Sequence, residues 1–373
     1  MKRLFVVILF AAALTACVNR MEINVPDAGS YLILNAMLSD DETSHTVYLS
    51  YCNGADMLAP SGAEVTLSVN GSAYSAADWT DGSYSGAYIF DAELKPGDVV
   101  RIDASYRGYT AYAEVEVPQR AEIVSVDTLR RVNAEVSDYS YGSGRLLQFV
   151  LGIRDVPGEK SWYRLTLERD FEFAAHFYEY PERTIYSRPD STYSEVSQLR
   201  FDIGSDKILL DDYLPDSSSG SYDGAEELLN LFNPHNTTRI FTDERFTDSG
   251  AEVKFEVDSL DFVPYYPGME FWRYDAPEYA GKCYSSYEAD VHPSARVRLQ
   301  SISFDAYTYF RAINSCETFG YETNPLIEPT TIPSNVVGGL GFVSVASISS
   351  AVVDFPQCHV LQPGGKPGFL EGE

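Results

Sequence analysis

The sequence predicts a mainly β chain, with an N-terminal immunoglobulin-like β-sandwich followed by a larger β-rich domain that contains a few short helices. The first observation behind this prediction is that apolar and polar residues alternate with a period of two in many short segments, as in strands with one face on a core. The second is that Tyr and Phe number 27 and 20 among 373 residues, and aromatic residues favour strands.

Short strands with turn signals between them fill residues 30–118. Asn70-Gly71 and Asp81-Gly82 are typical of hairpin turns, and no helical pattern interrupts the series. These features predict the sandwich, and Pro118 is expected to end it, because proline cannot donate a hydrogen bond inside a central strand. A fragment of residues 22–118 is therefore expected to fold alone. The expected strands are Tyr31–Leu38, Thr46–Tyr51, 64–70, Val99–Ser105 and 110–117.

Residues 119–363 are expected to form the second domain, and residues 364–373 a loose tail. Alternation predicts strands over 147–154, 163–168, 252–257 and 296–300. Helical spacing predicts one short helix over 223–229 and another that begins after Ser303. On the second helix Phe304, Tyr307 and Phe310 lie at helical spacing, and we expect this stripe to pack in the core.

The N-terminus has the layout of a lipoprotein signal peptide. Lys2 and Arg3 precede an apolar run of residues 4–14, and Leu14-Thr-Ala-Cys17 has the form of a lipobox. We therefore expect residues 1–16 to be removed, Cys17 to carry the lipid anchor, and residues 17–29 to be a spacer. No Asp follows Cys17, which favours delivery to the outer membrane. Whether the protein faces the periplasm or the outside stays open. The alternative is an ordinary signal peptide with an incidental cysteine.

Charge and motifs exclude several classes of function. Lys and Arg number 27 against 55 Asp and Glu, a formal net charge of -28, and such a chain repels nucleic acid. No nucleophile elbow, phosphate-binding loop or zinc-protease motif is present, so no catalytic residue, metal or cofactor is predicted. Two alternatives stay open. Asp40-Asp-Glu42 or Asp211-Asp212 could bind calcium, although acidic pairs in turns are usually solvated. Carboxylates of the second domain could hydrolyse envelope glycans or peptides.

Four cysteines remain beside Cys17. In the oxidising envelope we expect at least one disulfide among them, with no connectivity assigned. The alternative is that some are buried free thiols. The four residues are Cys52, Cys283, Cys316 and Cys358.

The most distinctive short stretch is Asn335-Val-Val-Gly-Gly-Leu-Gly-Phe342. It precedes a β-like run rather than a helix, so a phosphate cradle is disfavoured. Gly338, Gly339 and Gly341 are instead interpreted as structural, in a tight bend where glycine permits positive φ or close packing.

Aromatic residues are densest over 262–287, where several prolines accompany them. Aromatic side chains on a proline-rich loop often form a surface that recognises sugars or proteins. The alternative is that the loop buries these rings in the core of its own domain. The residues proposed for recognition are Tyr265, Tyr266, Trp272 and Tyr274.

Several motifs, in their order along nearly the whole mature chain, resemble the envelope lipoproteins of the domain of unknown function 4249 family, typical of Bacteroidetes. Relatives often have a second cysteine near Cys358, which this chain lacks. The resemblance implies no enzyme activity, and an accessory role in uptake beside a TonB-dependent outer-membrane receptor. The motifs are the lipobox, Tyr31-Leu-Ile-Leu-Asn-Ala-Met-Leu-Ser, His45-Thr-Val-Tyr-Leu-Ser, Phe241-Thr-Asp-Glu-Arg-Phe, Tyr307 to Arg311, Asn324-Pro-Leu-Ile-Glu-Pro, Ser334 to Phe342, and Gly364-Gly-Lys-Pro-Gly-Phe.

Together these observations predict a non-catalytic outer-membrane lipoprotein that binds a partner, or a glycan or peptide ligand. The alternatives are the carboxylate hydrolase and a structural or adhesive surface protein.

Overall fold

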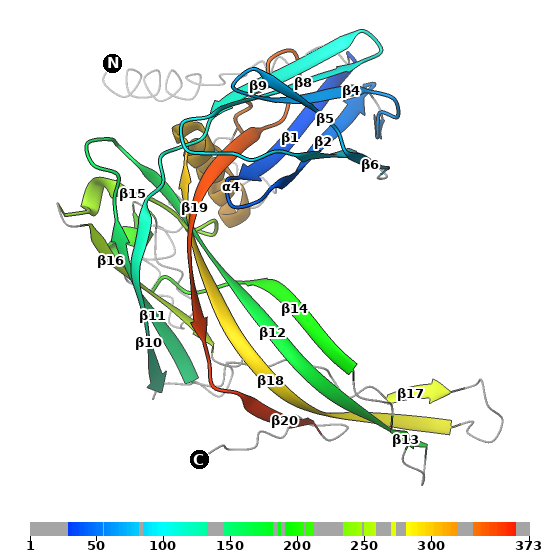
Figure 1. Ribbon diagram of the computed structural model, residues 1–373, viewed down its shortest axis with the longest axis vertical. Helices are drawn as coiled ribbons and strands as arrows, with labels where there is room; N and C mark the ends of the chain where they lie inside the picture. Colours follow the sequence, from blue (N-terminus) through cyan, green and yellow to red (C-terminus); the bar gives the residue numbers. More distant parts are fainter. Residues whose placement is uncertain are drawn as a thin grey trace, which may run out of the picture.

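The protein is described by a computed structural model, which shows a mainly β chain with few short helices and confirms the predicted fold class (Figure 1). The structure describes residues 29–54, 56–81, 85–132, 145–181, 186–187, 191–204, 206–211, 213, 234–247, 250–258, 270–273, 281–319 and 331–362.

The strands are β1 (Tyr31–Ser39), β2 (Ser44–Cys52), β3 (Met57–Leu58), β4 (Glu64–Val69), β5 (Ser72–Ser75), β6 (Asp78–Asp81), β7 (Gly86–Asp91), β8 (Val99–Tyr106), β9 (Tyr109–Glu116), β10 (Glu122–Val132), β11 (Arg145–Arg154), β12 (Trp162–Pro181), β13 (Tyr186–Ser187), β14 (Ser191–Leu199), β15 (Ile240–Thr242), β16 (Ala251–Asp258), β17 (Glu270–Arg273), β18 (Gly281–Ile302), β19 (Val343–Asp354) and β20 (Cys358–Gln362). The helices are α2 (Lys207–Leu210), the 3-10 turn η1 (Asp243–Arg245) and α4 (Phe304–Phe319).

The N-terminal strands form two facing layers. One is the four-stranded sheet β5-β4-β8-β9, and the other is the β19-β1-β2-β7-β6 part of a larger sheet. Both layers contribute to one core, in which Leu32, Leu49, Leu67, Phe90 and Ile102 are fully buried. The alternation read in the sequence therefore corresponds to an inner and an outer face in these strands. The finer prediction of an immunoglobulin-like sandwich stays a prediction.

Strand β19 joins the two parts of the molecule into one sheet (Figure 1). It pairs in parallel with β1 of the N-terminal part and antiparallel with β18 of the second part. Val343 and Val345, 0% and 1% exposed, lie in the N-terminal core, together with Val336 from the segment just before β19. The predicted boundary at Pro118 is not tested by this arrangement, but residues far along the chain complete the N-terminal core.

Two further cores stabilise the second part. The larger one lies between the β10-β11-β16 sheet and strands β12 and β18, where Phe149 and Phe255 stack at 5.0 Å between ring centroids. The smaller one lies under α4, where Tyr307 and Phe310 pack with Phe342 and Ile348. A side-chain hydrogen bond from the Tyr307 hydroxyl to Asp211, at 2.8 Å, attaches α4 to the end of α2. Burial, followed by this bond, raises the pKa of Tyr307.

Each predicted strand corresponds to an observed one, although β4 and β9 each end one residue earlier than predicted, and the helix expected after Ser303 is α4. The prediction that the whole aromatic stripe packs in the core was wrong for Phe304. Tyr307 and Phe310 are buried, but Phe304 is 56% exposed. Phe304 is the first residue of the helix, and among the described aromatic rings it contacts only that of Trp162. The helix expected over 223–229 and the tail lie outside the described residues.

Strands β12 and β18 are much longer than the alternation predicted. They pair over twenty residues each, from Trp162 with Ile302 to Pro181 with Cys283, and extend away from the N-terminal strands (Figure 1). The aromatic segment that we expected to be a loop over 262–287 is therefore strand in part, because β17 and the start of β18 lie within it. Long-range pairing, rather than local composition, orders these residues.

Candidate functional site: an arginine-lined pocket

A cavity of about 600 Å³ lies where β12, the end of β14 and the loop before β15 meet the C-terminal end of α4. Its polar lining includes Arg164, Arg200, Arg239, Thr237, Thr238 and Glu317. Three of the chain's 27 basic residues thus surround one cavity of a protein with a net charge of -28. Local positive charge on an acidic protein is the feature that makes this cavity a candidate site.

Two buried asparagines hold the loop of residues 236–239 in place. Asn236, 1% exposed, bonds the carbonyls of Leu209 and Ile240 through its side-chain amide. Asn314 of α4, 0% exposed, donates to the side-chain oxygen of Asn236 at 3.2 Å and accepts from the backbone N–H of Thr238 at 2.8 Å. Because buried amides are costly unless paired, this network fixes the loop against α4 and α2.

Arg164 is placed between the β12 sheet and α4. Trp162 and Arg164 share one face of β12, opposite the buried Tyr163, and α4 covers that face. The guanidinium lies 4.6 Å from the centroid of the Phe310 ring, and its Nε donates to the carbonyl of Thr238 at 3.3 Å. Burial lowers the pKa of Arg164. Within the described part of the chain, the guanidinium forms no ion pair with a carboxylate.

The neighbouring cations are held differently. Arg239, with φ of 59°, is drawn against β12 by a hydrogen bond from the N–H of Leu165 to its carbonyl at 3.0 Å. Its guanidinium donates to the carbonyls of Asn236 and Phe201. Arg200 follows β14, is exposed, and has no ion pair among the described residues. Arg164 therefore supplies a guanidinium held against Phe310, Arg239 is half-buried, and Arg200 is exposed.

This arrangement is suited to holding an anionic group. Guanidinium forks match carboxylate and phosphate oxygens in geometry, and a charge withdrawn from water without a partner is stabilised when an anion binds beside it. Thr238 lines the same cavity, and its Oγ1 is buried with no hydrogen-bond partner in the described structure.

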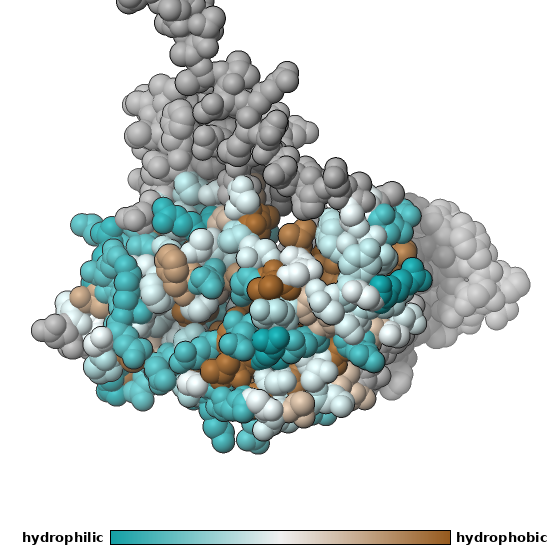
Figure 2. All heavy atoms as spheres, turned by 90° about the horizontal axis from the view of Figure 1, so that it is seen from above, coloured by the Kyte–Doolittle hydropathy of each residue, from teal (hydrophilic) through white to brown (hydrophobic). Residues whose placement is uncertain are grey.

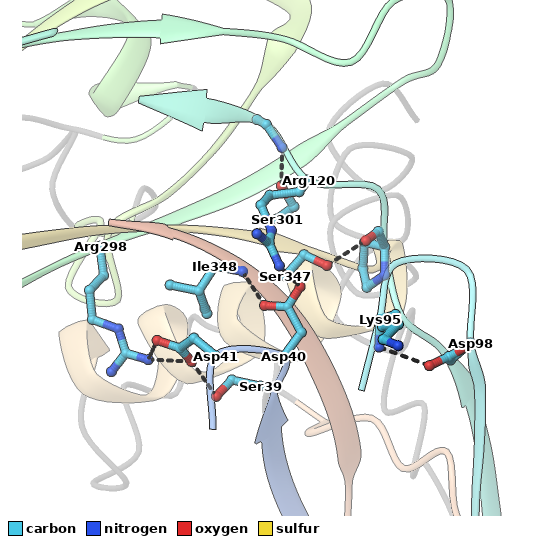
Figure 3. Close-up of polar contacts among 12 residues, drawn as sticks. Ser39, Asp40, Asp41, Lys95, Asp98, Arg120, Arg298, Ser301, Ser347 and Ile348 are labelled. Atoms are coloured by element: carbon cyan, nitrogen blue, oxygen red, sulfur yellow. Dashed lines mark hydrogen bonds and ion pairs between the residues drawn. The ribbon is translucent and has the colours of Figure 1, made fainter. Parts of the chain in front are cut away.

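The acidic tip at the end of β1, considered from sequence as a calcium site, instead joins the two parts of the protein (Figure 3). The Asp40 side chain is 0% exposed, binds Arg120 at 2.6 Å, and accepts from the N–H of Ile348 at 2.8 Å. Asp41 binds Arg298 at 2.7 Å, which also pairs with Glu168 at 2.9 Å. Both carboxylates thus serve as acceptors for arginine.

The segment after Pro118 is pinned to the same region. Ser347 donates to the carbonyl of Pro118 at 2.6 Å, and the N–H of Ala121 donates to Ser301 at 3.1 Å (Figure 3). The N–H of Ile123 donates to Ser349 at 3.0 Å. The crossing from the N-terminal strands to β10 is therefore bonded to β18 and β19 rather than free.

The glycine stretch passes close beside the N-terminal sheets. Gly338 and Gly341 have φ of 78° and 112°. A Cβ on Gly339 would lie 2.5 Å from the carbonyl oxygen of Leu32, and one on Gly341 would lie 2.1 Å from that of Leu34. Asn335 closes the bend by accepting from the N–H of Val343 and donating to its carbonyl. The stretch therefore has a packing role in the sandwich.

The predicted disulfide finds no support among the described residues. Cys52 and Cys316 are free thiols. Cys358 pairs with Val291 on β18, eight residues from Cys283 on that strand, so about 26 Å of backbone separates the two positions at about 3.3 Å per residue. Disulfides need Cα atoms within about 7 Å. Strand pairing, which the sequence does not reveal, sets these cysteines apart.

The residues proposed for recognition fall largely outside the described part. Tyr265, Tyr266 and Tyr274 lie outside the described residues, as does Cys17, the predicted lipidation site. The backbone of Trp272 lies in β17 and pairs with Lys282 of β18. The hypothesis of an aromatic recognition surface therefore stays untested.

Two carboxylates of the second part, Asp155 and Asp243, accept hydrogen bonds near the start of β12. Asp155 accepts a hydrogen bond from the Tyr163 hydroxyl, and Asp243 accepts from the N–H of Ser161 at 2.8 Å. Burial is the main factor that raises the pKa of Asp243, with Asp155 adding to it. These bonds hold the start of β12. Among the described residues, no three His, Cys, Asp or Glu side chains gather as metal ligands would. No helix in the described ranges is long and apolar enough to cross a membrane.

Comparison with known proteins places the chain in a family. A family model described as Domain of unknown function (DUF4249) matches residues 18–351. The chain belongs to this family. No curated protein matches the chain. The pocket of this DUF4249 protein lies within the matched region, as do the glycine stretch and the acidic tip of β1.

The pocket was not predicted from the sequence. Arg164 alternates with the buried Tyr163 and Leu165 and so lies on the other face of β12, which α4 covers. Arg164, Arg200 and Arg239 are separated by 36 and 39 positions, and no local pattern brings them together. The only available signal was Asn236-Thr-Thr-Arg239, a polar and basic run directly before the Phe241 motif.

Proposed function

We propose that this DUF4249 protein is an outer-membrane lipoprotein, anchored at Cys17, that acts as a non-catalytic binding component beside a TonB-dependent receptor in nutrient uptake. The lipobox supports the anchoring, and the family resemblance supports the receptor partnership. The pocket at Arg164 supplies the binding activity, and it takes the anionic end of a small ligand. The alternatives, an envelope hydrolase and an adhesive surface protein, have no comparable feature in the described residues.

The observation that carries the binding proposal is the set of three arginines around one cavity in a chain of net charge -28. A chain of net negative charge repels anions at long range, so anion binding here depends on the local arginines. The Arg164 guanidinium has no carboxylate partner in the described structure. The size of the cavity, about 600 Å³, falls in the range of small-molecule sites, about 300–1,000 Å³. Figure 2 shows hydrophilic and hydrophobic residues interspersed over the described part of the face seen from above.

Titration calorimetry with inorganic phosphate tests the proposal on the mature chain with Cys17 replaced by Ala. Arg164→Met keeps the contact with Phe310 but removes the charge, and it should weaken binding at least about tenfold, since hydrogen bonds to charged groups contribute about 1.5–3 kcal/mol. Arg154→Met is the matched control, because Arg154 is exposed and pairs with Glu122 outside the pocket. Binding that is absent, or equal in both variants, contradicts the proposal.

The receptor partnership needs a separate test. Tagged lipoprotein solubilised from envelopes in mild detergent should co-purify with a TonB-dependent receptor at a constant ratio. Recovery of the lipoprotein without any such receptor would contradict this part of the proposal and leave the binding activity standing.

A further inference from the structure

The charges around the pocket are arranged asymmetrically. Arg164 lies inward, between β12 and Phe310, and the exposed Glu317 lies at the outer edge on α4. Phe310, Asn314 and Glu317 are spaced by four and three residues, so they share the face of α4 that meets the cavity. The inner part of the pocket is therefore cationic, and one edge carries a carboxylate.

Arg164 and Glu317 meet the cavity at different levels of α4. Glu317 lies seven residues after Phe310, and at about 1.5 Å per residue the two backbone positions are about 10 Å apart along the axis. The Arg164 guanidinium is 4.6 Å from the centroid of the Phe310 ring. A ligand with opposite charges at its two ends can therefore lie along α4 between these levels.

Glu317 selects against a ligand that is only anionic. Its carboxylate forms no ion pair within the described part of the chain, and it would repel a second negative charge. Glu317 also lies in the last turn of α4, where the helix dipole stabilises cations. Both effects favour an ammonium group at this edge of the pocket.

We propose that the ligand is a short peptide of about three residues with free termini, its carboxylate on Arg164 and its ammonium group on Glu317. This inference rests on the proposed binding function of the same pocket. An extended chain spans about 3.3–3.6 Å per residue, so three residues have about the length of the helix rise between Phe310 and Glu317.

Calorimetry with a matched set of peptides tests the inference on the mature chain. The set is triglycine, N-acetyl-triglycine, triglycine amide and diglycine, with inorganic phosphate as the probe of anion binding alone. Triglycine should bind at least about tenfold more tightly than each of the other three peptides, because each loses one charged contact or falls short of it.

Glu317→Gln provides the decisive variant. It should lower the affinity for triglycine to that of the acetylated peptide, and leave phosphate binding unchanged or tighter. Glu64→Gln, at an exposed position of β4 in the N-terminal part, is the control and should change neither. Equal affinity for triglycine and its acetylated form, or an unchanged triglycine affinity in Glu317→Gln, overturns the inference. If phosphate binding is still weakened by Arg164→Met, the proposed anion-binding function stands. If Arg164→Met leaves phosphate binding unchanged, both the proposed function and the peptide inference are overturned.

Discussion

The N-terminal sandwich should require the start of β19 to be stable. The sequence predicts that residues 22–118 fold alone, but the structure places Val336, Val343 and Val345 in their core, at 8%, 0% and 1% exposure. Burying one valine contributes about 1.5–3 kcal/mol, so the three contribute about 4.5–9 kcal/mol. The net stability of a whole domain is only about 5–15 kcal/mol. A fragment that ends at residue 118 should therefore be unfolded or marginal.

Two recombinant fragments test this expectation by urea denaturation followed with circular dichroism. One contains residues 29–118, and the other joins residues 29–118 to 334–351 through a flexible linker of about twelve residues, long enough to reach the β1 edge. The joined form should unfold cooperatively, and Val343→Ser in it, as a control for chain length, should remove much of that gain. If residues 29–118 alone unfold at the same urea concentration as the joined form, the claim that the core is shared is wrong.

Three further predictions concern single residues. Gly341→Ala should lower the free energy of unfolding by about 2–4 kcal/mol in urea denaturation, because the added Cβ would lie 2.1 Å from the Leu34 carbonyl oxygen at a φ of 112°. Gly62→Ala, at a φ of 81° with no atom within 4 Å, should lower it by less, and equal losses would contradict the packing argument. Asp40→Ala should lower the free energy of unfolding by about 2–3 kcal/mol, because Arg120 and the N–H of Ile348 lose a buried acceptor. Asp56→Ala, at an exposed position, should change it by less than about 0.5 kcal/mol. An unchanged stability in Asp40→Ala would show that the contact between the two parts of the protein does not depend on this carboxylate. Cys17→Ala should release the protein from membrane fractions or leave an uncleaved precursor, and an acylated mature protein from that variant would refute lipid anchoring at this residue.

The strands were predictable because their signal is local. Leu147, Phe149 and Leu151 alternate with polar or smaller neighbours, and all three are buried on one face of β11. Helical spacing likewise predicted α4, and the glycines before β19 indicated a bend. In each case the residues that carry the signal are neighbours in the chain, and the burial of one face explains the pattern.

What the sequence did not reveal depends on contacts between distant residues. The parallel pairing of β1 with β19 joins positions about 307 residues apart, as between Ala36 and Val343, and no periodicity encodes a partner strand. The Asp40-Asp41 pair was expected to be solvated, but its arginine partners come from two other segments. The pocket is not encoded by any local pattern, because Arg164, Arg200 and Arg239 lie in three separate segments of the chain and meet only in the folded structure.

The most direct test of the central claim is a crystal structure of the mature protein soaked with selenate, an anion whose anomalous scattering identifies it. The account predicts selenate in the cavity, with oxygen atoms within hydrogen-bond distance of the Arg164 guanidinium and of at least one of Arg200 and Arg239. A cavity without selenate, in crystals where the ion is bound at other arginines, would contradict the claim that this pocket holds the anionic end of a ligand.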